Sequence, residues 1–185
     1  VNGLTTDMGD IRVTAGGTLT ASSVTAGDAG DVYLTTGSGD IAAGLITALD
    51  DDVYLNAAGS ITDGDTGVDI YAGRLYLTAG ADVGATGDYL DTRVNNIDDY
   101  SATENVAGSI YISEYDGVNL GALTSTGLTT DSGSVFVESN ATEDGTLTAT
   151  LVTAGGSGDI SLKSQAGAAS TGNVNDIAVG LLTAS

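Results

Sequence analysis

The chain has 185 residues, a length typical of one domain, and 25 Asp and Glu against 4 Lys and Arg give it a formal net charge of −21. It contains no His and no Cys, which excludes thiol nucleophiles, Ser-His-Asp triads, His-ligated metals and zinc ribbons. Four basic side chains cannot neutralise a phosphate backbone or an anionic bilayer surface, so we expect no nucleic-acid partner and no docking on such a membrane. The longest apolar runs are far short of the roughly 20 residues that span a bilayer, so we expect no membrane insertion. Only 16% of the residues are charged and 41% are hydrophobic, which indicates a folded acidic chain rather than a disordered one.

One short phrase recurs seven times, in which Asp, Arg or Ser precedes an apolar residue, a variable residue and a second apolar residue. It occupies Asp10–Val13, Asp31–Leu34, Asp52–Leu55, Arg74–Leu77, Ser109–Ile112, Ser134–Val137 and Asp159–Leu162. Successive phrases start 21, 21, 22, 35, 25 and 25 residues apart. Periods of this size are typical of solenoids, and the alternation of apolar positions predicts that each phrase is a strand.

Two further apolar clusters separate the phrases. The first clusters lie at Leu19, Ile41, Ile61, Val83 and Val118, and the second at Val24, Leu45–Ile46, Val68 with Ile70, Leu128 and Leu151–Val152. Three short strands per turn, joined by small and turn-forming residues, predict an all-β fold, a parallel β-helix of about seven to eight rungs. An antiparallel sandwich stays open, but it gives no reason for the phrase to recur in register.

Both ends of the chain repeat its interior. Gly3–Ile11 parallels Gly127–Val135, and Asp176–Ala184 parallels Asp40–Ala48. Neither end carries the polar cap that an open β-edge needs. We therefore expect a single domain over 1–185, whose ends meet flanking repeats of a longer chain or other copies in a filament.

The phrases Gly30–Ile41 and Ala58–Ile61 resemble the repeats of filamentous-haemagglutinin-type bacterial adhesins, the exoproteins of two-partner secretion. The resemblance covers nearly the whole chain, although the period here is longer and less regular than in that family. It implies a right-handed parallel β-helix at the bacterial cell surface or outside the cell, with a role in attachment or as a stalk. Possible partners would then include glycans or the surface of a host or neighbouring cell.

Aromatic residues recur at the middle position of the phrase, which faces outward if its neighbours face the core. The predicted outward line reads Arg12, Tyr33, Tyr54, Tyr76, Tyr111, Phe136 and Ser161. Three interpretations stay open: a platform for sugar rings, a lateral contact with another chain, or rings that stabilise the sheet by stacking on each other.

Acidic residues suggest calcium as a possible ligand. Asp31 and Asp52, with Asp10, would stack one rung apart, and Asp63, Asp65 and Asp69 have the spacing of a calcium loop. The alternative is that each Asp accepts a hydrogen bond from a turn. No Glu follows at the twelfth loop position, so the second group is not an EF-hand.

The 35-residue interval predicts a loop excursion over residues 86–105, which would be either a binding loop or a plain solvated loop. We do not expect an enzyme, because β-helix lyases that act on acidic sugars need basic residues around the substrate. The sequence thus favours a stalk segment of an adhesin or the subunit of an extracellular filament. The alternative is a glycan-binding or carbohydrate-active domain that uses the aromatic line.

Overall fold

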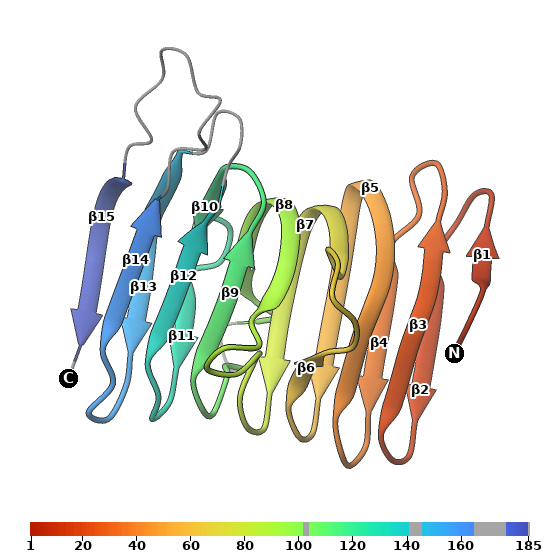
Figure 1. Ribbon diagram of the computed structural model, residues 1–185, viewed down its shortest axis with the longest axis horizontal. Helices are drawn as coiled ribbons and strands as arrows, with labels where there is room; N and C mark the ends of the chain where they lie inside the picture. Colours follow the sequence, from red (N-terminus) through yellow and green to blue (C-terminus); the bar gives the residue numbers. More distant parts are fainter. Residues whose placement is uncertain (102–103, 141–145, 165–176, 185) are drawn as a thin grey trace.

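The structure is a computed structural model that describes residues 1–101, 104–140, 146–164 and 177–184 (Figure 1). The described residues form strands and loops and no helix. The strands are β1 (Leu4–Thr6), β2 (Ile11–Ala15), β3 (Leu19–Ala26), β4 (Val32–Thr36), β5 (Ile41–Ala57), β6 (Ile61–Asp63), β7 (Ile70–Ala79), β8 (Leu90–Asp99), β9 (Ile110–Glu114), β10 (Val118–Leu120), β11 (Leu128–Thr130), β12 (Val135–Ser139), β13 (Leu147–Ala154), β14 (Ile160–Ser164) and β15 (Ile177–Ala184).

Every pair of neighbouring strands is parallel, and the chain coils into a β-solenoid of about seven turns. Figure 1 shows the strands as successive rungs of one elongated body, with the two termini at opposite ends. The predicted all-β parallel β-helix is therefore confirmed. It forms because one apolar–X–apolar phrase recurs, so that each turn buries the same face that the previous turn buries.

The core is a continuous column of aliphatic side chains inside the coil. Leu34, Leu55, Leu75, Leu77, Ile97 and Ile112 are all fully buried. Buried Ala and Val side chains fill the rest of the column. Burial of this kind contributes about 25 cal/mol per Å² of apolar surface, and it is the main stabilising term.

The seven phrases do not lie in one column. The strand register places Ile11, Val32, Val53 and Leu75 in a first column, which continues through Ile97, Leu120 and Ala149. A second column contains Leu19, Ile41, Ile61 and Val83, and it continues through Ile110, Val135 and Ile160. The first four phrases thus belong to the first column and the last three to the second. In Figure 1 the phrase strands β9, β12 and β14 of the second column lie side by side.

A half-turn shift explains the 35-residue interval. Positions along the first column are 22 residues apart from Leu75 to Ile97 and 23 apart from Ile97 to Leu120, so the turn length is nearly constant there. The fourth phrase starts at Arg74, and the 22-residue turn that follows ends at its register partner Asn96. The fifth phrase starts 13 residues later, at Ser109, which is roughly half a turn further. The rung of the first column at Ile97 is therefore an ordinary rung whose sequence lacks the phrase.

The predicted loop over 86–105 is wrong for most of its length, because Leu90–Asp99 forms strand β8 between β7 and β9. The register pairs Leu77 with Asp99 and Ala79 with Val106. Of the predicted loop, residues 102–103 lie outside the described residues. The excursion is therefore shorter than predicted. The sequence of β8 lacks a clear alternation of apolar and polar residues, because Asp98 and Asp99 occupy buried positions there.

Candidate functional site

Three tyrosines of the first column stack face to face on the outside of the solenoid. The ring centroids of Tyr33 and Tyr54 are 4.5 Å apart with an interplanar angle of 2°, and those of Tyr54 and Tyr76 are 4.7 Å apart at 6°. These distances match the spacing of neighbouring strands. The Arg12 guanidinium lies 3.5 Å from the centroid of the Tyr33 ring, so it covers the outer face of the stack.

The aspartates that precede these tyrosines form a second line of contacts between rungs. Asp31 Oδ2 accepts a hydrogen bond from the hydroxyl of Tyr33 (2.9 Å), and Asp31 Oδ1 accepts one from the backbone amide of Asp52 (3.1 Å). Asp52 likewise accepts the Tyr54 hydroxyl at 2.9 Å, and its other oxygen accepts the side-chain Nε of Arg74 at 2.5 Å instead of a backbone amide. We call this network the aspartate–tyrosine ladder; its members are Asp10, Arg12, Asp31, Tyr33, Asp52, Tyr54, Arg74 and Tyr76.

Within the ladder, the rings and carboxylates that were candidates for ligand binding contact each other instead. The facing ring surfaces of Tyr33, Tyr54 and Tyr76 pack on each other, so no sugar ring can stack between them. Both carboxylate oxygens of Asp31 and of Asp52 already have donors within this network. Burial, together with the bond to Asp52, raises the pKa of the Tyr54 phenol, which keeps it protonated as a donor.

We expect Asp52→Ala to lower the free energy of unfolding by about 2 kcal/mol, because it removes two hydrogen bonds that involve a nearly buried charged group. Asp7→Ala, at an exposed position, should change it by less than about 0.5 kcal/mol. Urea denaturation followed by circular dichroism measures both. Equal stabilities of the two variants would show that the ladder has no structural role.

The predicted aromatic line of five rungs is divided by the half-turn shift. Tyr111 and Phe136 stack in the second column, with centroids 4.9 Å apart at 10°, and the Tyr89 ring tilts against Tyr111 at 5.8 Å. In the first column, the residue in register with Tyr76 on the next rung is Asp98. One continuous platform from Tyr33 to Phe136 is therefore absent from the structure. The five residues form two separate stacks.

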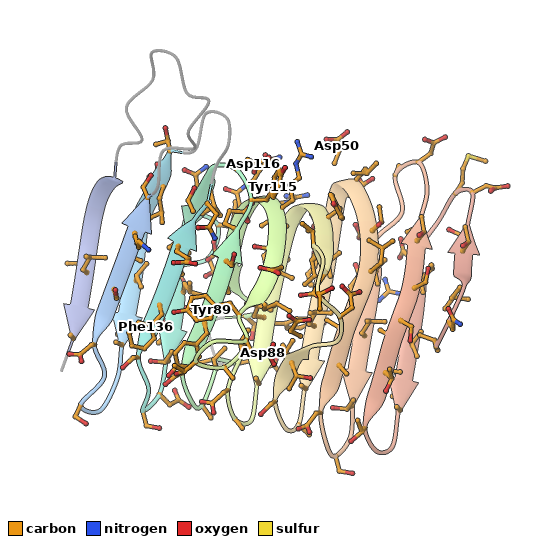
Figure 2. All side chains as sticks on the ribbon, viewed as in Figure 1. Asp50, Asp88, Tyr89, Tyr115, Asp116 and Phe136 are labelled. Carbon is orange, nitrogen blue, oxygen red and sulfur yellow. The ribbon has the colours of Figure 1, made fainter. Side chains whose placement is uncertain are left out.

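A shallow acidic hollow of about 420 Å³ lies beside the second stack. It is lined by Asp63, Gly87, Asp88, Tyr89, Asp91, Ser113 and Glu138. Figure 2 shows Asp88 and Tyr89 on the same side of the molecule as Phe136. Tyr89 and Glu138 also line a neighbouring hollow of about 200 Å³ with Phe136 and Lys163. The four carboxylates that line the larger hollow, those of Asp63, Asp88, Asp91 and Glu138, favour cationic groups over anionic ones.

The segment that contains Asp63, Asp65 and Asp69, which have the spacing of a calcium loop, forms turns. Asp63 Oδ1 accepts the Asp65 amide and Asp65 Oδ1 accepts the Gly67 amide, each at 2.7 Å. Asp69 is fully buried and accepts the Asp91 amide at 2.9 Å. In the described ranges, no group of three or more Asp or Glu side chains converges closely enough to hold a metal ion. The calcium site therefore stays a prediction without geometric support.

Sequence reasoning missed three further buried acids, which are Asp98, Asp99 and Glu114. Asp98 accepts the amides of Leu123 and Thr124, and Glu114 accepts the Thr92 hydroxyl at 2.7 Å. Burial raises the pKa of Glu114 well above its ordinary value. One signal could have found Glu114, because it continues the inward alternation of Ile110 and Ile112.

No protein-family model, no curated protein and no solved structure matches this chain. No helix long and apolar enough to cross a membrane occurs in the part of the chain that the structure describes. The strand register therefore defines the fold, and only the side chains of this chain bear on its function.

Proposed function

We propose that this chain is a structural segment of an extracellular bacterial surface protein, either a stalk segment of an adhesin or the subunit of a filament. The observation that carries the proposal is the aspartate–tyrosine ladder. Its rings, carboxylates and guanidinium groups bind the neighbouring rung, so the outer face of the solenoid adds to the cohesion along its axis. A rod that holds a partner at a distance needs this kind of axial reinforcement.

Three further features support this role. The net charge of −21 keeps such rods apart in solution, and the absence of Cys suits a chain that is exported unfolded. The Gly30–Ile41 phrase resembles the repeats of filamentous-haemagglutinin-type adhesins. We favour the structural role over glycan binding because Tyr33, Tyr54 and Tyr76 use their ring faces within the stack.

Negative-stain electron microscopy of the purified chain, with and without calcium, tests the proposal. We expect stiff rods, with an axial length of roughly 34 Å for seven rungs at the usual strand spacing, or filaments built from such units. Filaments would identify a self-assembling subunit, and single rods would identify a stalk segment. Particles without a long axis, or cleavage of a polysaccharide by the purified chain, would contradict the structural role.

A further inference from the structure

Two buried carboxyl groups hold strand β8 at its two ends. At the first end, Asp69 Oδ2 accepts the backbone amide of Asp91, at 2.9 Å. At the other end, Asp99 is the last residue of the strand, and its Oδ1 accepts the backbone amide of Thr129 at 3.1 Å. Both carboxyl groups are fully buried. Strand β8 therefore depends at each end on an acid that has no access to water.

Each of these two acids has one oxygen without a hydrogen-bond donor, Oδ1 in Asp69 and Oδ2 in Asp99. The other buried acids near β8 differ in this respect. Asp98 Oδ1 and Oδ2 accept bonds from Thr124 and Leu123, and both oxygens of Glu114 also have donors. A buried ionised carboxylate with an empty acceptor is costly, and protonation of that oxygen removes the charge, because a neutral group costs much less to bury than an ion.

The charged groups around Asp69 do not offset a negative charge. Asp63 is the last residue of β6, Asp65 lies in the loop that follows it and Asp91 lies in β8, and all three raise the pKa of Asp69. The β5 residue that donates its amide to the Asp69 carbonyl is Ile46, which is apolar. Burial is the largest cause, and together these effects raise the pKa of Asp69 to about 8.

Asp99 has similar surroundings. Its neighbours Asp98, in β8 itself, and Asp131, just beyond β11, both raise its pKa. Its register partner in β7 is Leu77, and the residue that donates to it from β11 is Thr129, neither of which is charged. Burial is again the largest cause and raises the pKa of Asp99 to about 8.

We propose that strand β8 is a proton-controlled latch, which Asp69 and Asp99 hold in the solenoid as neutral carboxylic acids and release when they ionise. The strand is well placed for this role. It pairs with β7 on one side and with β9 and β10 on the other, and it is the rung at which the phrases change columns. Opening of β8 uncouples the first four phrases from the last three.

The direction of the pH effect follows from the raised pKa values. Opening transfers each carboxyl from an environment with a pKa of about 8 to water, where it ionises near pH 4. The docked strand therefore has its full stability below about pH 4, and it loses this stability as the pH rises toward about 8. Between these limits the opening constant rises about tenfold per pH unit for each carboxyl that is released.

Hydrogen–deuterium exchange with mass spectrometry tests the latch in the intact chain. Exchange rates are corrected for the intrinsic pH dependence of amide exchange. We expect the corrected rate of peptides from β8 to rise at least about tenfold per pH unit from about pH 5 to about pH 7.5, and to level off above about pH 8. Peptides from β4, which pairs only with strands outside the latch, provide the internal reference.

Variants separate the latch from a general loss of stability. Asp69→Asn and Asp99→Asn should each reduce the pH slope in β8, and Asp7→Asn should retain it. The double variant should leave only the slope due to Glu114, whose carboxylate holds Thr92 and Val94 of β8 and whose pKa is also raised by burial. The single variants keep the test valid if the double variant does not fold. An equal slope in β8 and β4, or an unchanged slope in both single variants, would overturn the proposal. Slow exchange restored at about pH 8 by calcium chloride would also overturn it, because the two acids would then hold a cation rather than protons.

Discussion

Replacement of Ile97 by Ala should lower the free energy of unfolding by about 2–5 kcal/mol, the range for deletion of a large buried aliphatic side chain. Ile97 is fully buried between Leu75 and Leu120 of the first column. Removal of its side chain leaves a cavity in the middle of the solenoid, and rigid neighbouring rungs cannot close it. Urea denaturation at equilibrium measures the loss.

The control is Asn95→Ala, an exposed position in the same strand, which should change stability by less than about 0.5 kcal/mol. This pair of variants discriminates between the two descriptions of residues 86–105. If these residues formed a solvated loop, both substitutions would be nearly neutral. A large loss for Ile97→Ala alone is expected only if β8 is a rung of the core.

Gly80→Ala should destabilise the chain by about 3 kcal/mol, near the upper end of the usual cost of overpacking. A Cβ atom at this position would lie 2.1 Å from the carbonyl oxygen of Ala58 on the previous rung. The obstacle is backbone, so the turns that follow β5 and β7 would have to move apart, which costs more than the rotation of one side chain. A decrease in melting temperature of roughly 6–12 °C is expected for a domain of this size.

Gly16→Ala is the matched control, because a Cβ atom there would meet nothing within 4 Å and its backbone does not adopt a positive φ. Substitution of a glycine at such a position should leave stability unchanged or raise it by up to about 1 kcal/mol through the unfolded state. Similar melting temperatures for the two variants would contradict the close approach of successive rungs at Gly80.

The sequence alone determined the architecture of this protein. Residues such as Val32 and Leu34 alternate with outward ones, the phrase recurs every 21–25 residues over most of the chain, and Gly separates the strands. These signals are local, and each turn of a solenoid contacts only its neighbours, so local periodicity is enough to predict stacked parallel strands. The same reasoning placed Tyr33, Tyr54 and Tyr76 correctly on one outward line.

The tertiary structure alone decided which strands share a column. A 35-residue interval is compatible with one long loop or with one and a half turns, and periodicity cannot distinguish them when Asp98 and Asp99 interrupt the apolar pattern of the extra rung. The register of β8 against β7 settles the choice, and it separates Tyr111 and Phe136 from the first stack. The partners of Asp69 and Asp99 were equally hidden, because burial and missing donors depend on which rungs lie above and below a residue.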